Sequence, residues 1–347
     1  MASTKRMGCA VAQIMAVAGL MAAATPLTAA AGTKVTIGIT AGGAGLFIPT
    51  YIAMDKGFYA REGLDAEFVA MSGKALVTAG LGGALNFLPL PGGASQATLK
   101  GAKLRFIVGQ SLISQWTIVV PKEINSVQEL KGKTLGYSRP GAADYDEGEI
   151  VLSRFFNMEV GRDYNVISLA SEADRIAALL NNNIQGALVS LPHAARAQVA
   201  GYKVLIRLGE YLPRVGGTYW VTEDYFQKNP DTVKRFIRAM ARAEEFLADD
   251  RDGSVPIIQK YFGIKDAKEA GFIWDQVHDT YGPDIPEKLY RDLYDGRIEA
   301  SKKAGLWAKD KPMPDIEAWV GRDRLTGTLR EMGYYLQRSR NPAAKTN

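Results

Sequence analysis

The chain has 347 residues, a formal net charge of +5, and apolar and charged shares of 47% and 23%. This is the composition of an ordinary globular protein, long enough for two lobes, and it excludes a low-complexity chain. The basic excess is small and scattered, so we expect no nucleic-acid partner.

The N-terminal 31 residues predict an export signal. Lys5 and Arg6 precede an apolar run over residues 11–24, and small residues follow it. The run is too short to span a bilayer, so we expect a periplasmic protein that is cleaved near Ala30 to Gly32. Removal of this segment also removes the single cysteine and leaves a net charge of +5 − 2 = +3. The mature chain therefore excludes thiol chemistry and thiolate metal sites.

Residues 34–70 predict a strand, a loop of small residues, a helix and a second strand. Pro49 suits the first turn of the helix, because a proline lacks the N–H that would be unpaired there, and Gly57 stops the helix. The loop over residues 41–45 is almost free of side chains and follows the first strand. Ligands of open α/β sheets bind at such carboxyl ends of strands.

The helix and the turn after it carry a motif of aromatic, small and charged residues. Its members are Phe47-x-Pro49-x-Tyr51-x-Ala53-x-Asp55-Lys56-Gly57-Phe58-Tyr59-x-x-Glu62-Gly63-Leu64. The motif resembles the opening of the periplasmic binding proteins of nitrate, sulfonate and taurine type ABC importers, a family that includes binders of thiamine pyrimidine precursors. The resemblance covers roughly residues 34–333, and it implies a type II periplasmic-binding-protein-like fold with two α/β lobes.

The predicted lobes are joined by two crossings. A second strand–loop–helix unit is expected, with its strand over residues 134–137 and its helix over residues 143–156. The resemblance implies a first lobe that is discontinuous in sequence and a second lobe inserted within it. We expect lobe 1 to contain residues 32–118 and 220–337, lobe 2 to contain residues 119–219, and residues 338–347 to form a disordered tail.

Between these units, the patterns predict further short elements. A strand is expected over residues 84–88, and a helix is expected over residues 194–200 after a strand-end loop that contains Pro192 and His193. The long helix that begins at Asn229-Pro230 places Met240 on its apolar face, where we expect it in the core.

The sequence offers little for catalysis. It has no G-x-S-x-G elbow, G-x-x-x-x-G-K-[ST] loop or H-E-x-x-H helix, and only two histidines. A lone His193 after a strand is no metal site. We therefore expect no enzyme, no catalytic residue, no cofactor and no metal; the alternative is an exported enzyme or a ligand-sensing module on the same fold.

The ligand is expected at the strand-end loops, where helix amino termini favour a negative group. Asp144, Asp146, Glu147 and Glu149 crowd one of these termini and partly cancel its attraction for an anion. We therefore expect an organic ligand with at most one acidic group, and the nearby aromatic residues favour a ring. The candidate ligand-binding residues are Thr40, Gly45, Phe47, Phe87, Leu88, Pro89, Trp116, Ser138, Arg139, Gly141, Pro192, His193, Thr218 and Tyr219.

Several of these candidates have a second interpretation. Phe87 could be a core residue, Arg139 could be solvated, and His193 could be an ordinary residue of a helix start. With the resemblance, the whole pattern predicts a monomeric solute-binding subunit of an ABC importer. It would capture a small organic solute, such as an aromatic or heterocyclic acid, a sulfonate or a pyrimidine, and deliver it to a membrane permease.

Overall fold

The computed structural model describes residues 32–40, 45–71, 73–89, 91–140, 142–212, 215–284 and 319–334, together with positions 287, 288, 291, 292, 294, 295, 298, 302 and 315. The predicted export signal and the predicted C-terminal tail lie outside the described residues. No helix in the described part of the chain combines the length and the apolar character that a membrane span needs.

The strands and the helix of the first predicted unit are confirmed, and residues 41–44 of its loop lie outside the described residues. Strand β1 (Thr33–Thr40) pairs in parallel with β2 (Leu64–Met71), with Val35 opposite Ala66. Between them lie the 3₁₀ helix η1 (Gly45–Phe47), α1 (Ile48–Asp55) and α2 (Phe58–Arg61). Gly57 separates the two α-helices at φ +69°, a conformation that glycine adopts without steric cost.

A second pair of strands is antiparallel, and it joins distant parts of the chain. β3 (Leu104–Gly109) pairs with β9 (Thr218–Thr222), and α3 (Gly73–Leu81) and α4 (Pro91–Leu99) precede them. The predicted strand over residues 84–88 is wrong. Phe87 bridges only to Ile37 of β1 and Leu88 only to Trp220 of β9, so the chain passes between two sheets instead of running along one.

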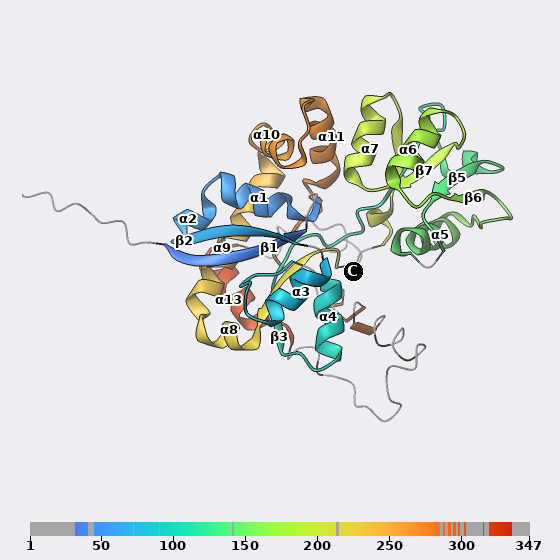
Figure 1. Ribbon diagram of the computed structural model, residues 1–347. Coiled ribbons are helices and arrows are strands. Elements are labelled where there is room, and N and C mark those ends of the chain that lie inside the picture. The colour runs from blue at the N-terminus through green and yellow to red at the C-terminus, as the bar shows by residue number, and fades with distance from the viewer. Residues whose placement is uncertain are drawn as a thin grey trace, which may run out of the picture. The chain divides into compact units, whose positions relative to one another are not determined.

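The remaining strands form one five-stranded sheet in the order β6-β5-β7-β4-β8. Strand β5 is parallel to its neighbours β6 and β7, whereas β4 is antiparallel to its neighbours β7 and β8. The strands are β4 (Thr117–Val120), β5 (Thr134–Tyr137), β6 (Asn165–Ser168), β7 (Gly186–Val189) and β8 (Lys203–Arg207). The helices that connect them are η2 (Val127–Leu130), α5 (Ala143–Phe156), α6 (Glu172–Leu180) and α7 (Leu191–Val199), and η3 (Leu208–Glu210) follows β8 (Figure 1).

Helix α7 begins three residues earlier than expected. Leu191, Pro192 and His193 form its first turn and are not a strand-end loop, and Ser190 stands at its amino-terminal cap with extended backbone. Proline is tolerated in a first helical turn because its N–H is not needed there. His193 therefore lies on a helix that starts directly at the end of β7.

The C-terminal part of the described chain is helical. It contains α8 (Glu223–Lys228), α9 (Pro230–Asp249), α10 (Arg251–Phe262), α11 (Ala267–Val277) and α13 (Arg322–Glu331). Helix α9 buries an apolar face that includes Phe236 and Met240, which confirms the core position expected for Met240. Full burial of such a side chain contributes about 1.5–3 kcal/mol.

The buried apolar side chains form four clusters that divide along the sequence. Two clusters contain residues up to Leu112 and from Val215 onward, and two contain residues between Ile118 and Leu208. Leu191 and Ala195 of α7 are the exception, because they pack into the first group. The start of α7 is therefore a point of contact between the two groups of clusters.

Candidate functional site

Gly45, at the start of η1, lies against two segments that are distant in sequence. A Cβ atom added to Gly45 would stand 2.9 Å from Oε1 of Gln115 and 2.9 Å from Cδ1 of Leu191. Gln115 lies two residues before β4, and Leu191 opens α7. Glycine is thus needed at position 45, because a side chain there would prevent η1 from lying so close to Gln115 and Leu191.

The carbonyl groups at the start of η1 are held by side chains. Nε2 of Gln110 donates to the carbonyl of Leu46 at 3.0 Å, and the hydroxyl of Tyr281 donates to the carbonyl of Gly45. Nε2 of Gln115 donates in turn to the Tyr281 hydroxyl at 3.3 Å. Burial raises the pKa of Tyr281, so this hydroxyl keeps its proton at neutral pH. The backbone at the start of η1 is therefore held by uncharged hydrogen-bond donors.

A buried ion pair lies at the end of β5. Oγ of Ser138 donates to Oδ1 of Asp144 at 2.5 Å, and Nη1 of Arg175 donates to Oδ2 at 2.9 Å. Asp144 and Arg175 are 5% and 2% exposed. Nε of Arg175 also donates to the carbonyl of Leu169 at 2.9 Å. The pair therefore neutralises the acid that opens α5.

This pair changes one expectation from the sequence. The acids of the first turn of α5 were expected to weaken its attraction for an anion, but Arg175 cancels the charge of Asp144. Glu147 accepts a hydrogen bond from the hydroxyl of Ser114, a residue just before β4. Arg175 comes from α6, and no local pattern links it to residue 144.

A second polar group lies at the end of β7. Oε2 of Glu172 accepts hydrogen bonds from the backbone N–H and the hydroxyl of Ser190, at 2.6 and 2.7 Å. Burial lowers the pKa of His193, and the neighbouring Arg196 and Arg175 lower it further, whereas Glu172 raises it. His193 is thus neutral at pH 7, and a neutral imidazole can both donate and accept a hydrogen bond.

The predicted site residues differ in how far they are exposed to solvent. Thr40 is the last residue of β1. Phe47, Phe87, Leu88, Pro89, Ser138, Thr218 and Tyr219 are buried, Trp116, Pro192 and His193 are half-buried, and Arg139 is exposed. Gly45 is buried as well, and Gly141 lies outside the described residues. Their contact with a ligand stays a prediction.

Two of the buried aromatic residues have core partners. The ring of Phe87 stacks on Phe236 with centroids 3.8 Å apart, and the hydroxyl of Tyr219 lies 2.5 Å from Oγ1 of Thr50. Phe87 is thus packed as its core interpretation expects. A ligand would reach these rings only after the surrounding side chains moved.

Sequence reasoning missed most of the polar residues that organise the site. The missed residues belong to no sequence motif, because their hydrogen-bond partners lie on other elements of the fold. They are Gln110, Gln115, Arg175 and Tyr281. Glu172, in the first turn of α6, was not among the predicted site residues either. Within the described part of the chain, no group of three or more His, Cys, Asp or Glu side chains is arranged to hold a metal ion.

The chain is similar to known proteins over most of its length. The family model described as NMT1/THI5 like matches residues 45–253. YtlA of Bacillus subtilis (strain 168) is 24% identical over 285 residues, which are 79% of this chain and 77% of that protein.

Two solved structures show the same fold. The periplasmic aliphatic sulphonate binding protein SsuA from Escherichia coli matches with a TM-score of 0.64 at 18% identity, covering 82% of this chain and 91% of SsuA. The desulfurization enzyme DSZB matches with a TM-score of 0.58 at 15% identity, covering 86% of this chain and 99% of DSZB. The fold thus serves both binding and catalysis.

Proposed function

The chain belongs to the NMT1/THI5-like family and has the fold of type II periplasmic binding proteins, and from this premise we propose that it is the solute-binding subunit of an ABC importer. It binds a small organic solute between two lobes in the periplasm and delivers it, as a monomer, to a membrane permease. The lobes comprise residues 32–118 with 220–337, and residues 119–219. The division of the apolar clusters supports two lobes, but it places Ile118 with the second lobe and Val215 and Tyr219 with the first.

The observation that carries the proposal is the contact of Gly45 with Gln115 and Leu191. It brings the start of η1, at the end of β1, to the start of α7, at the end of β7. The first N–H groups of a helix lack intrahelical acceptors and favour a negative group. A ligand held between these two helix starts would draw the lobes together, since it contacts both of them.

The electrostatics of the site favour a ligand with at most one acidic group. Asp144 and Arg175 cancel each other's charge, and the neutral His193 adds a donor and an acceptor without net charge. The half-buried Trp116 offers an aromatic face beside the crossing to β4. An aliphatic or aromatic sulfonate, an aromatic or heterocyclic carboxylate, or a pyrimidine fits this combination.

The test is a ligand screen by thermal shift, followed by calorimetry. The panel contains alkanesulfonates, taurine, aromatic carboxylates, pyrimidines, nitrate and sulfate. Because a ligand that binds only the folded state stabilises it by about 2.7 kcal/mol at 100 times Kd, a true ligand gives a clear shift. We expect stabilisation by one organic class; stabilisation by nitrate or sulfate alone would reject the organic ligand.

The likeness to DSZB favours one alternative, an exported enzyme on the same fold. Cys9, the single cysteine, lies in the predicted export signal, so an enzyme on the mature chain would have to act without a thiol. The stabilising compound is incubated with the protein and recovered for mass spectrometry. Recovery of the unchanged compound supports transport, and its conversion at a rate proportional to protein concentration would establish the enzyme.

A further inference from the structure

Helix α7 and strand β8, which belong to the proposed second lobe, contact helix α11 of the first lobe. Ala194 and Ala197 of α7 pack into an apolar cluster of the five-stranded sheet. Leu191 and Ala195, on another face of α7, pack into the cluster that contains the buried apolar residues of α11. Helices α7 and α11 lie side by side (Figure 1). Helix α7 therefore packs against both proposed lobes.

Polar side chains cross between the lobes beside these two helices. Nε2 of Gln276 donates to Oε1 of Gln198 at 2.9 Å. Nη2 of Arg207 donates to the backbone carbonyl of Gln276 at 2.8 Å and to Oδ1 of Asp279 at 3.3 Å. We call these four residues the interlobe clasp. Gln198 and Arg207 come from the second lobe, and Gln276 and Asp279 come from the first.

Arg207 makes charge-assisted hydrogen bonds, which are stronger than those between neutral groups. It is the last residue of β8, and its guanidinium group reaches the carboxyl end of α11, where backbone carbonyls lack partners within the helix. Its side chain is 23% exposed. The neighbouring pair of Arg196 and Glu269, at 3.5 Å, contains an arginine side chain that is 64% exposed, so it contributes little. Arg207 therefore carries most of the polar attraction between the lobes at this contact.

The buried amide of Gln276 is only partly satisfied. Its Nε2 donates to Gln198 and to the carbonyl of Phe272, but its Oε1 is buried without a hydrogen-bond partner among the described residues. An unpaired buried acceptor costs free energy, which contact with water would restore. Separation of α7 from α11 would let water reach this oxygen. The joined and separated states are therefore closer in free energy than they would be with apolar packing alone.

The interlobe clasp is continuous with the proposed ligand site. Asp279 lies two residues before Tyr281, whose hydroxyl donates to the carbonyl of Gly45. On the other side, Leu191 of α7 lies against Gly45. Both sides of the clasp therefore belong to segments that also position the start of η1.

We propose that the interlobe clasp holds the two lobes partly closed before a solute binds, and that Arg207 is the positioning residue that sets this balance. Because a solute between the lobes binds the closed state, its apparent affinity is proportional to the closed fraction. The clasp thus regulates the affinity of the site without touching the solute. The inference rests on the two-lobed function proposed above, but its first test needs no solute.

That test is the distance across the clasp in the protein without added solute. Spin labels are placed on Ala177→Cys in α6 and Ala267→Cys in α11, two exposed positions on opposite sides of α7. The background carries Cys9→Ser, because Cys9 is the single cysteine of the chain. Double electron–electron resonance then gives a distance distribution that lengthens when α11 separates from α7.

Arg207→Gln should move this distribution to longer distances. Arg207→Lys keeps the charge but loses the planar group, so we expect an intermediate shift. The double variant Gln198→Met with Gln276→Met replaces the partly satisfied amides by apolar side chains of similar size, and it should raise the share of short distances.

Solute binding gives the second measurement. The probe is the compound of the screening panel that stabilises the parent most. Arg207→Gln should bind it about threefold to tenfold more weakly, mainly through faster release, because a smaller fraction of the protein is closed. The double methionine variant should release it more slowly than the parent.

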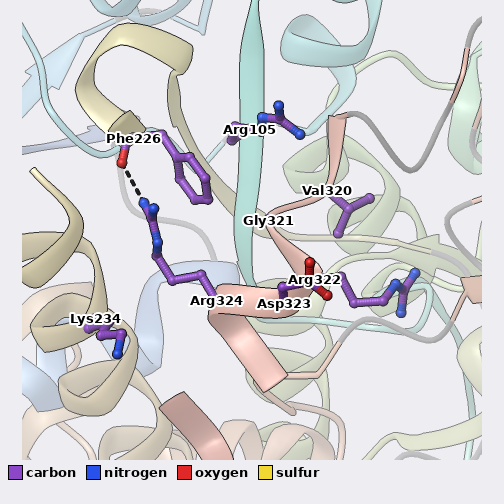
Figure 2. Close-up of a pocket in the computed structure, with 8 residues that line it drawn as sticks. All are labelled: Arg105, Phe226, Lys234, Val320, Gly321, Arg322, Asp323 and Arg324. Atoms are coloured by element: carbon purple, nitrogen blue, oxygen red, sulfur yellow. Dashed lines mark hydrogen bonds between the residues drawn. The ribbon is translucent and has the colours of Figure 1, made fainter. Parts of the chain in front are cut away.

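The matched control is Arg105→Gln. Arg105 lines a pocket beside β3 together with Phe226 (Figure 2), and it pairs with Glu223 of the same lobe. Its side chain is 23% exposed, the same fraction as that of Arg207. The control removes a comparable ion pair without a contact between lobes, so its distances should follow the parent. Should Arg207→Gln fail to fold by circular dichroism, Asp279→Asn removes the same ion pair from the other lobe, with a shift in the same direction.

Two results without solute would overturn the clasp. These are unchanged distances in both Arg207→Gln and Asp279→Asn, and equal shifts in Arg207→Gln and Arg105→Gln. The clasp and the binding function fail in different ways. A shift in Arg207→Gln, with a parent whose distances no panel compound changes, would support the clasp and count against the binding function. A compound that closes the parent, with no shift in solute-free Arg207→Gln, would support the binding function and reject the clasp.

Discussion

The hydroxyl of Tyr281 donates a hydrogen bond to the backbone carbonyl of Gly45, a residue 236 positions earlier in the chain. Gln115 donates to the same hydroxyl, and Tyr281 is 6% exposed. A residue that follows α11 thus holds the start of η1. The geometry of the proposed ligand site therefore depends on a contact between distant parts of the sequence.

Tyr281→Phe tests this contact. The ring stays, but the buried carbonyl of Gly45 loses its donor, so we expect the free energy of unfolding to fall by about 1–3 kcal/mol. Solute affinity should fall as well, because the start of η1 is no longer held. Urea denaturation and calorimetry measure the two effects.

The control for Tyr281→Phe is Tyr202→Phe. The Tyr202 hydroxyl also donates to a backbone carbonyl, that of Leu179 at 3.2 Å, but it lies on the five-stranded sheet side, away from Gly45. Tyr202→Phe should lower the free energy of unfolding without a change in solute affinity. Equal losses of solute affinity in both variants would show that the Tyr281 hydroxyl has no specific role in the ligand site.

Gly45→Ala tests the close approach of η1 to α7. The added methyl group would stand 2.9 Å from Gln115 Oε1 and Leu191 Cδ1, too close for either contact to persist unchanged. We expect tenfold or weaker solute binding and a loss of about 1–3 kcal/mol in stability from overpacking. Gly327→Ala is the control, because a Cβ there meets nothing within 4 Å, and an alanine in helix α13 should raise stability slightly. Unchanged solute affinity in Gly45→Ala would show that the ligand binds elsewhere.

The pair of Asp144 and Arg175 predicts a non-additive stability effect. Arg175→Met leaves the carboxylate of Asp144 buried without its cation, which should cost about 3–5 kcal/mol. The double variant Asp144→Leu with Arg175→Met removes both charges and should recover much of that loss. Urea denaturation of the two single variants and the double variant forms a complete cycle. A double variant as unstable as the sum of the singles would show that the two side chains act independently.

Because the carboxyl of Glu244 is buried, we expect the free energy of unfolding to fall as the pH rises. Its side chain lies in the core on α9, and neither carboxyl oxygen has a hydrogen-bond partner among the described residues. Burial raises its pKa well above the usual 4.5, and the charge of Glu245 adds to this. The protonated form is thus favoured by folding. Its contribution is complete below pH 4.5 and is lost as the pH rises through the pKa of the folded state.

Glu244→Leu removes this dependence. The free energy of unfolding of the parent should fall as the pH is raised from about 5 to about 8, because its buried Glu244 favours the protonated form. The variant lacks this carboxyl, so its stability relative to the parent should rise over the same range. Urea denaturation at several pH values gives the comparison. The exposed Glu159→Gln serves as control and should follow the parent. A parent and a Glu244→Leu variant with parallel pH profiles would contradict the assignment.

Local patterns predicted many elements with correct bounds. The strand expected over residues 134–137 is β5, and the helix expected over residues 143–156 is α5. Apolar alternation, helix-start residues and glycines act within a few residues, so the sequence shows them directly. The strand expected over residues 84–88 failed because its pairing depends on Ile37 and Trp220, which belong to two different sheets.

The candidate site shows the same division. The sequence by itself determined the small residue after β1 and the family to which the chain belongs, because these follow from neighbouring residues. Only the tertiary structure decided that Arg175 neutralises Asp144 and that Tyr281 holds Gly45. Long-range packing selects such partners, and no residue next to Arg175 or Tyr281 in the sequence encodes the identity of the group it meets.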